Sequence, residues 1–283
     1  MDFASEVLSV ETDVHVATLW LDRPDARNAM GPAFWDDLPR AMALLSADHD
    51  VRAVVVAARG PHFSVGLDLK AMGAGLVAGN PAGTGGGVER PPSAAARGHA
   101  IRASVLRMQA AVNSVADCRK PVVAAVHGYC IGGGMDLIAA CDIRLAAASS
   151  VFSVRETRMA IVADLGSLQR LPRIVGAGHV AELAYTGKDI GAGRAREIGL
   201  VNDVHPDATA TLEAARAMAG EIAANSPLAV QGTKAVLSAN DGRTVAQGLD
   251  FVATWNAGML SSDDLVEAMA AFMEKRDPRF TGG

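Results

Sequence analysis

The chain has 283 residues, of which 50% are apolar, 20% are charged and only 4% are aromatic. This length suffices for one large domain, or for a core with a smaller appendage, and the composition is that of a globular protein with an aliphatic interior. The formal net charge is -5 and there is no long run of Lys or Arg, which disfavours nucleic acid and anionic membranes as partners.

The cysteines and the N-terminal segment bear on the cell compartment. Cys118, Cys130 and Cys141 lie in apolar or helical stretches without the spacing of metal ligands, so we expect reduced, structural thiols and no metal site. The first ten residues lack the basic region and apolar run of a signal peptide, and no segment has the roughly 18 apolar residues of a membrane span. We therefore expect a cytoplasmic protein without a membrane partner.

The N-terminal part predicts a hairpin, a helix and a buried strand. Two β-rich runs, at residues 7–10 and 14–21, flank three polar residues and indicate the hairpin. Residues 51–58 form a continuous apolar run, which is typical of a parallel strand buried on both faces and implies crossover helices. The intervening helix should begin at Gly31-Pro32, because apolar residues follow at helical spacing: Phe34, Leu38, Met42 and Leu45.

The middle of the chain combines a segment without periodicity and a second buried strand. Residues 73–98 are rich in Gly, Pro and Ala and predict a loop, either a tolerated insertion or a lid over a ligand. A helix is expected over residues 99–116 and a buried strand over residues 121–126. That strand leads directly into the sequence HGYCIGGGMD.

Beyond residue 200 the pattern becomes mostly helical, with apolar stripes on two helices. Such stripes pack either on the chain's own core or on another subunit, and the sequence leaves both alternatives open. The first stripe comprises Val245, Leu249, Val252 and Met259, and the second comprises Leu265, Met269 and Phe272.

Three consecutive glycines, Gly132–Gly134, stand between the second buried strand and a helical pattern. Glycines there let a ligand approach the main chain, and the first amides of the helix carry the positive end of its dipole, which favours an anion. The alternative is that they only allow helix and strand to pack tightly. The spacing differs from the G-x-G-x-x-G of dinucleotide folds. Residues 63–68 could supply a second amide, and two converging amides form an oxyanion hole.

Three carboxylates are the acid–base candidates, and each has a structural alternative. Asp136, in the first turn after the glycines, would complement the helix dipole. Glu156 lies between Arg155 and Arg158 and could form a surface ion pair, while Asp164 could cap a helix beginning at the next residue. Two histidines, His62 and His127, lack a neighbouring nucleophile elbow, so a triad hydrolase finds no support.

Taken together these segments resemble the crotonase superfamily, the enoyl-CoA hydratases and isomerases. The resemblance covers most of the chain and implies an α/β fold: a spiral of repeated ββα units with a C-terminal α-helical trimerisation region, forming trimers or pairs of trimers. It implies a core at residues 1–199 with the acyl-CoA site and a helical oligomerisation region at residues 200–283. The amides of Leu67 and Gly133 would form the oxyanion hole. The matching stretches are LDRPDARNAM, HFSVGLDL, HGYCIGGGMDLIAACDIRLA, FSVRE, DLGSLQRLPRIVG and TGKDIGAGRAREIGLVNDV.

Within that superfamily the carboxylates resemble the delta-3,5-delta-2,4-dienoyl-CoA isomerase branch. Ordinary hydratases have Glu where this chain has Asp136 and a small residue where it has Asp164. The resemblance implies that Glu156 removes a proton from C2, that Asp164 protonates C6, and that Asp136 tunes its neighbours. Coenzyme A is then part of the substrate, no separate cofactor is expected, and individual phosphate contacts stay unassigned.

Two other functions stay open from the sequence. An enoyl-CoA hydratase would use Glu156 and Asp136 to activate a water molecule for addition to a C2–C3 double bond. A catalytically idle acyl-CoA-binding or scaffolding protein would keep the fold for assembly alone. Arg158 departs from the small or acidic residue expected at its position and leaves the range of substrates open.

Overall fold

A seven-stranded sheet organises the core of the computed structural model, which describes residues 3–78 and 93–283. The strand order is β1-β2-β3-β4-β5-β7-β10, antiparallel up to β3 and parallel from β3 onward. Their bounds are β1 Phe3–Ala4, β2 Leu8–Asp13, β3 Val16–Leu21, β4 Ala53–Ala58, β5 Val122–Val126, β7 Ile143–Ala147 and β10 Asp203–His205.

The expected hairpin is confirmed, with its turn at Val14 and His15 rather than at residues 11–13.

The expected buried strand is β4, in which every residue is buried. Alternate β4 residues enter two separate apolar clusters, Val54 and Val56 on one face and Val55 on the other, because side chains alternate along a strand. Both faces of the sheet are therefore covered.

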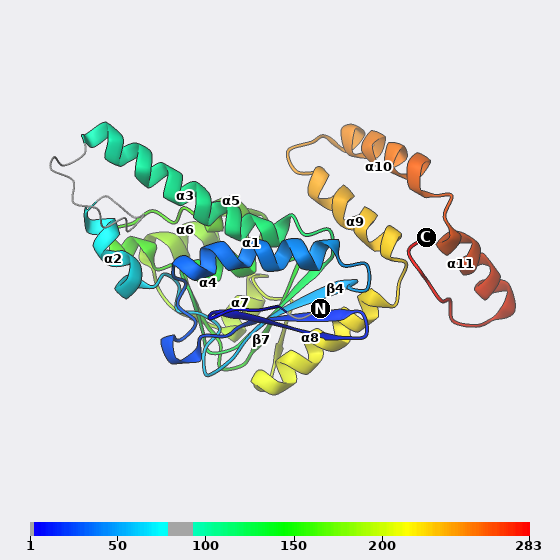
Figure 1. Ribbon diagram of the computed structural model, residues 1–283, viewed down its shortest axis with the longest axis horizontal. Coiled ribbons are helices and arrows are strands. Elements are labelled where there is room, and N and C mark those ends of the chain that lie inside the picture. Colours follow the sequence, from blue (N-terminus) through cyan, green and yellow to red (C-terminus); the bar gives the residue numbers. More distant parts are fainter. Residues whose placement is uncertain (1–2, 79–92) are drawn as a thin grey trace.

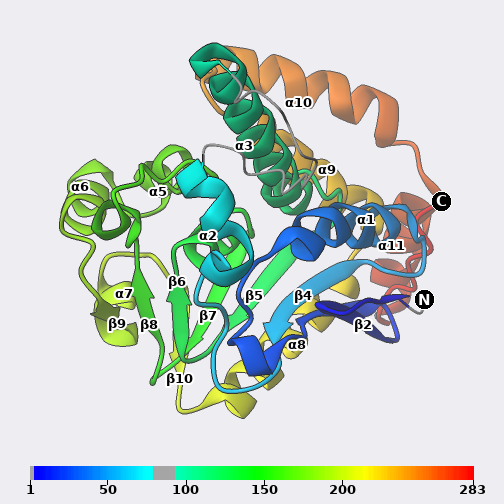
Figure 2. The same cartoon turned by 60° about the vertical axis from the view of Figure 1, so that its left-hand side comes forward.

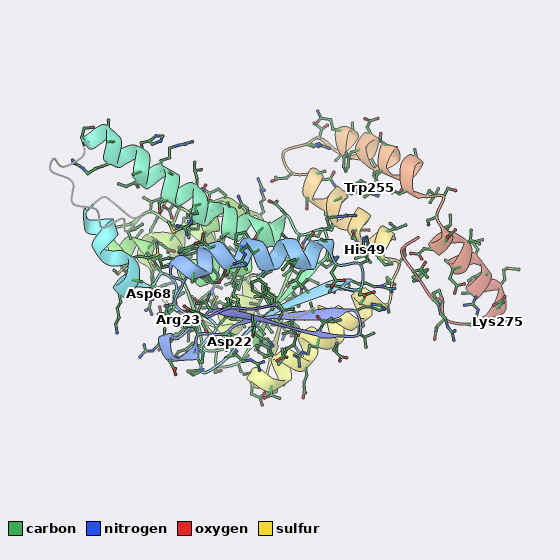
Figure 3. All side chains as sticks on the ribbon, in the orientation of Figure 1. Asp22, Arg23, His49, Asp68, Trp255 and Lys275 are labelled. Atoms are coloured by element: carbon green, nitrogen blue, oxygen red, sulfur yellow. The ribbon has the colours of Figure 1, made fainter. Side chains whose placement is uncertain are left out.

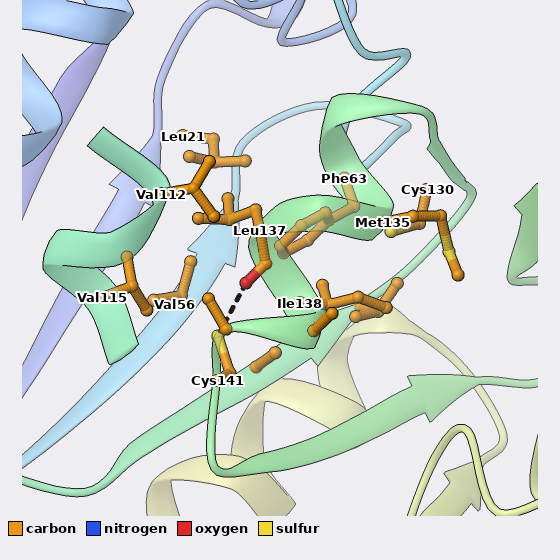
Figure 4. Packing of buried hydrophobic residues seen from close by; sticks show 14 of the residues in the cluster. Leu21, Val56, Phe63, Val112, Val115, Cys130, Met135, Leu137, Ile138 and Cys141 are labelled. Carbon is orange, nitrogen blue, oxygen red and sulfur yellow. Dashed lines mark hydrogen bonds between the residues drawn. The ribbon is translucent and has the colours of Figure 1, made fainter. Parts of the chain in front are cut away.

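Three helices cover one face of the sheet and one covers the other. Helix α1 (Pro32–Ala47), which begins after Gly31 as predicted, α3 (Ala94–Ala116) and α4 (Gly133–Ala139) pack on the first face. The close-up in Figure 4 shows Met135, Leu137 and Ile138 of α4 within this core. Helix α8 (Ala208–Ala223) buries a stripe of alanines on the opposite face.

The ββα repeat is visible where the chain passes between the two sheets. Strands β5 and β7 lie in the large sheet, whereas the strands that follow them, β6 (Tyr129–Ile131) and β8 (Val151–Ser153), pair with each other in a three-stranded sheet with β9. Each pair of strands then leads to helical segments. The remaining bounds are 3-10 helices η1 Pro24–Ala26 and η2 Glu156–Met159, helices α2 Leu69–Ala78, α5 Ser167–Ile174, α6 Ala177–Thr186 and α7 Ala192–Glu197, and strand β9 Ile190–Gly191.

Three C-terminal helices extend away from this layered core: α9 (Pro227–Ala239), α10 (Val245–Met259) and α11 (Asp263–Glu274) (Figures 1 and 2). The predicted division at residue 199 falls before β10 and α8, both of which belong to the core. In space the appendage begins with α9. The division into two domains at residues 1–199 and 200–283 stays a prediction.

The predicted loop at residues 73–98 is corrected at both ends. Helix α2 continues through Ala78, and α3 begins at Ala94 because Ser93 accepts a hydrogen bond from the amide of Ala96 and caps the helix. Residues 79–92 lie outside the described residues, so the insertion and lid alternatives stay predictions. Among residues 3–78 and 93–283, none of the helices is both long and apolar enough to cross a membrane.

Candidate active site

A cavity of about 680 Å³ lies where the two sheets, α3 and the segment before α5 meet. All five groups that the resemblance singled out line it, although they lie far apart in the chain. They are Leu67, Gly133, Asp136, Glu156 and Asp164.

The amides of Leu67 and Gly133 come from two loops that lie side by side. Met30 donates its amide hydrogen to the carbonyl of Gly66 and accepts one from Asp68, a parallel bridge that leaves the amide of Leu67 directed away from Met30. Gly133 is the first residue of α4, where amides have no acceptor within the helix. Neither amide has an acceptor among the residues that the structure describes. Two N–H groups are therefore available to one oxyanion.

Two glycines make this approach possible. Gly66 has φ +82°, and a Cβ there would lie 2.8 Å from the carbonyl oxygen of Ile131 and 3.2 Å from the nitrogen of Gly133. Gly132 has φ +54°, and a Cβ there would lie 3.4 Å from Glu156 Oε1. A side chain at either position would strain the backbone and crowd the site. Gly134, the last glycine of the run, packs against Ser64 and Cys130. At this position the glycine allows the helix and the strand to pack tightly, which was the alternative considered for the run.

The Glu156 carboxyl lies beside the glycine loop at the start of η2. Its Oε2 is buried and has no hydrogen-bond partner among the described residues. Burial raises the pKa of Glu156 to about 7, and the neighbouring carboxyls of Asp136 and Asp164 act in the same direction. Glu156 is therefore able to take up or hold a proton near neutral pH.

Asp136 projects from the first turn of α4 and is almost fully buried. Its Oδ1 accepts a hydrogen bond of 2.7 Å from the amide of Ser167, the first residue of α5. Burial raises the pKa of Asp136 to about 6 in spite of that bond and of the positive charge of Arg170. Asp136 therefore does lie where it complements the helix dipole, but that alternative does not account for its burial or its raised pKa.

Asp164 is not the helix cap that the sequence allowed. Helix α5 begins three residues later, after its N-cap residue Gly166, and its first amide donates to the side chain of Asp136, not to that of Asp164. The carboxyl of Asp164 instead lines the cavity, where burial raises its pKa above the ordinary value. Its main-chain carbonyl accepts a hydrogen bond of 2.6 Å from Gln109 Nε2 of α3.

The arginines beside Glu156 do not pair with it, so the surface ion-pair alternative is wrong. Arg155 holds Asp189 with two hydrogen bonds, of 2.5 and 2.6 Å, from its Nη2. Arg158 donates to the carbonyl of Thr186 and packs on Gly187, away from the cavity. Both cations are drawn towards the end of α6, which leaves the Glu156 carboxyl without a cationic partner.

Other polar residues near the site, including the two histidines considered in the sequence, have structural partners. Arg23 pairs with Asp68 at 2.6 Å, and Figure 3 shows the two labelled side by side; Asp68 also caps α2. His127 contacts the carbonyl of Gly60, and the rings of His62 and Tyr129 stack at 4.6 Å. Within residues 3–78 and 93–283 there is no group of three or more His, Cys, Asp or Glu side chains arranged to hold a metal.

One wall of the cavity is a face of α3 that the sequence predicted as a helix but not as part of a site. The residues that line it recur at helical spacing, since they are Ile101, Ser104, Val105 and Met108. Trp35 of α1 adds an aromatic ring, and its indole N–H is bonded to the sulfur of Met72. The cavity therefore has a polar end at the carboxyls and an apolar side suited to a hydrocarbon chain.

The comparison with known proteins covers most of the chain. A sequence model described as Enoyl-CoA hydratase/isomerase matches residues 11–87 and 94–283. The chain belongs to this family. The predicted membership of the enoyl-CoA hydratase/isomerase family is thereby confirmed.

Two curated relatives and one solved structure illustrate the similarity within the family. The peroxisomal Delta(3,5)-Delta(2,4)-dienoyl-CoA isomerase of Arabidopsis thaliana is 42% identical over 275 residues, which cover 97% of this chain and 96% of the relative. The mitochondrial Delta(3,5)-Delta(2,4)-dienoyl-CoA isomerase of Rattus norvegicus is 40% identical over 268 residues, which cover 94% of this chain and 78% of the relative. The crystal structure of an enoyl-CoA hydratase from Bacillus anthracis superposes with a TM-score of 0.86 at 31% identity. The superposition covers 98% of this chain and 100% of the hydratase. The predicted α/β crotonase fold is confirmed.

The expected cytoplasmic location is wrong on this comparison. The similar isomerases are peroxisomal in Arabidopsis thaliana and mitochondrial in Rattus norvegicus. The prediction rested on reduced cysteines and on an N-terminal segment without the features of a secretory signal, and neither test detects the addresses of other organelles.

Proposed function

We propose that this chain is an acyl-CoA isomerase that converts 3,5-dienoyl-CoA to 2,4-dienoyl-CoA in fatty-acid degradation. The observation that carries the proposal is the presence of three carboxyls with raised pKa values, Asp136, Glu156 and Asp164, in one cavity with two free amides. The similar proteins named as dienoyl-CoA isomerases support the same reaction.

In the proposed reaction the thioester oxygen accepts hydrogen bonds from the amides of Leu67 and Gly133. Glu156 removes a proton from C2, and the electron pair forms a dienolate whose charge lies on that oxygen. Collapse of the dienolate forms the C2–C3 and C4–C5 double bonds, removes those at C3–C4 and C5–C6, and takes up a proton at C6 from Asp164. Only a proton and two double bonds move, so the reaction needs no electron carrier. Each amide contributes about 2.7 to 4 kcal/mol to lowering the barrier.

The two proton-transfer groups require opposite protonation states. Glu156 must be ionised to act as the base, and its pKa of about 7 places that change near neutral pH. Asp164 must be protonated to act as the acid, which the raised pKa of its half-buried carboxyl favours. In this scheme Asp136, held by the amide of Ser167, positions and tunes both. The dependence of kcat/KM on pH should therefore be bell-shaped.

An ultraviolet assay of the purified protein tests the proposal. With a 3,5-dienoyl-CoA we expect the conjugated 2,4-dienoyl chromophore to appear. With a trans-2-enoyl-CoA we expect little loss of enoyl absorbance, because hydration is not the proposed reaction. Rapid loss of enoyl absorbance without dienoyl formation would make the protein a hydratase, and tight binding of both esters without turnover would make it a binding or scaffolding protein.

We also propose that the chain assembles as a homotrimer or homohexamer through α9, α10 and α11. Both apolar stripes predicted from the sequence remain largely exposed in the single chain; for example Val245 is 80% exposed and Phe272 is 77% exposed. A groove of about 580 Å³ between these helices is lined by further apolar residues, including Trp255. Exposed apolar surface of this extent supports burial against another copy of the chain.

A further inference from the structure

Helix α3 reaches the segment that carries Asp164, and it does so through Gln109. We propose that Gln109 is a positioning residue that sets where the Asp164 carboxyl stands along the acyl chain. The proposal rests on the isomerase function above, because it concerns delivery of the proton to C6. Nothing in that reaction requires Gln109 to touch the substrate.

The Asp164 carboxyl depends on its main chain for its position. Apart from its own main-chain amide, no group among residues 3–78 and 93–283 is bonded to or paired with this carboxyl, in contrast to Asp136, which is held by the amide of Ser167. The main chain at Asp164 is fixed from outside, because its carbonyl accepts a hydrogen bond of 2.6 Å from Gln109 Nε2. A carboxyl that no other residue holds can rotate to give up a proton while its tethered Cα stays in place.

A second contact holds the same segment one helical turn further along α3. Asn113 lies four residues after Gln109, on the same face of the helix, and its Oδ1 accepts a hydrogen bond of 2.6 Å from Arg170 Nη2 of α5. The guanidinium of Arg170 covers Gly166, which has φ +130° and has no space for a side chain. Gln109 and Asn113 thus hold the segment between Asp164 and α5 at two points.

The same helix also faces the substrate cavity. Met108, next to Gln109 in sequence, and Val105 line the cavity, while Gln109 itself is half-buried and does not. The acyl chain would therefore contact α3 on one side while α3 holds the acid on the other. The distance between the base Glu156, fixed at η2, and the acid Asp164 is set by the position of this helix.

The test separates the two proton transfers. Wild-type protein, Gln109→Leu and Gln109→Ala are incubated with a 3,5-dienoyl-CoA in D₂O, and two rates are followed: formation of the 2,4-dienoyl chromophore, and deuterium uptake at C2 of the recovered substrate. We expect kcat for isomerisation to fall on the order of 10- to 100-fold, the range for a catalytic group displaced by about 1 Å, with KM nearly unchanged. Deuterium uptake at C2 should stay within about threefold of wild type, because Glu156 is untouched.

Gln169→Leu provides the matched control. It makes the same substitution on α5, next to the same segment, where the glutamine side chain is exposed. Both rates should stay at wild-type values. An equal fall in both rates for the Gln109 variants, or no fall in either, would overturn the proposal. The wild-type reaction measured on the same day tests the isomerase function separately, so a failure of Gln109 leaves that function standing.

Discussion

The layered core and the helical appendage use apolar residues in opposite ways. Every residue of β4 is buried, and both faces of the sheet carry closed apolar clusters. In α10 the only buried residue is Gly248, and the attachment of the appendage to the core is largely polar: Lys234 of α9 bonds Asp142 at 2.7 Å, and Arg52 bonds the carbonyl of Phe280 at 2.8 Å. The core buries its apolar residues on itself, whereas the appendage leaves its apolar stripes largely exposed in the single chain.

The largest expected effect lies in the core. Asp164→Asn should lower kcat for isomerisation by a factor on the order of 10² to 10⁴, the usual contribution of a general acid. The fold should be unaffected, since no other described residue bonds the Asp164 carboxyl, and Gln109 donates to the main-chain carbonyl instead. Steady-state kinetics and thermal unfolding of the same preparation measure both quantities. Full activity in Asp164→Asn would remove Asp164 from the mechanism.

The second prediction concerns the geometry of the oxyanion hole. Gly66→Ala places a Cβ at φ +82° and 2.8 Å from the carbonyl of Ile131, so the loop must move and the amide of Leu67 with it. We expect kcat to fall by a factor on the order of 10² to 10³, as when one oxyanion donor is lost, with a loss of about 1 to 2 kcal/mol in unfolding free energy.

Gly178→Ala on α6 is the control for Gly66→Ala. A Cβ at Gly178 would meet nothing within 4 Å. Activity should be unchanged, and stability should be equal or slightly higher, because alanine favours a helix by roughly 1 kcal/mol over glycine. Similar losses for both variants would mean that the close approach of the two loops is unimportant.

How far the sequence determined this site depends on the kind of group. The glycine run and the loop at residues 63–68 predicted two converging amides, because strand-to-helix junctions place amides in a recognisable pattern. The carboxyls were weak candidates one at a time: only burial and the loss of the Arg155 and Arg158 partners to other groups distinguish Glu156 from a surface residue. Burial and ion pairing depend on contacts between segments that are distant in the sequence, and the periodicity of one segment does not predict such contacts.

Gln109 shows the same limit more sharply. The sequence predicted a helix at residues 99–116, and that helix is confirmed, yet which of its faces meets the segment at Asp164 depends on how α3 docks on the core. The start of α5 was also missed, because Asp164 resembles a cap by composition while Gly166 and the amide of Ser167 decide the actual geometry. Local patterns predict elements; contacts between elements complete the site.

The third prediction uses the unusual pKa of Glu156. Its folded pKa of about 7 exceeds its ordinary value of 4.5, so the folded state binds the proton more tightly than the unfolded state. The contribution of this carboxyl to the free energy of unfolding is therefore fully present below about pH 4.5, and it is lost as the pH rises through about 7. Glu156→Gln removes the charge and should raise the free energy of unfolding at pH 8 by up to about 3 kcal/mol, with little effect at pH 4.5.

Urea unfolding at the two pH values measures this difference, and the activity of Glu156→Gln should be lost at both. Glu213→Gln, at an exposed position on α8, is the control and should change stability by less than about 0.5 kcal/mol at either pH. A variant at position 156 that is less stable than wild type at pH 8 would contradict the burial of an unpaired carboxyl.

The smallest expected effect on a single chain, and the sharpest test of the comparison, comes from the appendage. Phe272→Asp adds a charge at a position that is 77% exposed on α11, so the folded monomer should lose less than about 0.5 kcal/mol. If the stripe is a subunit interface, the same change buries an unpaired charge there, and sedimentation should show dissociation to smaller species. Leu106→Asp is the matched control, since Leu106 is 44% exposed on α3 of the core, and it should leave the assembly intact. Dissociation by Leu106→Asp, or an assembly unaffected by Phe272→Asp, would place the interface elsewhere, and the apolar surface of α11 would then have no role that the chain itself explains.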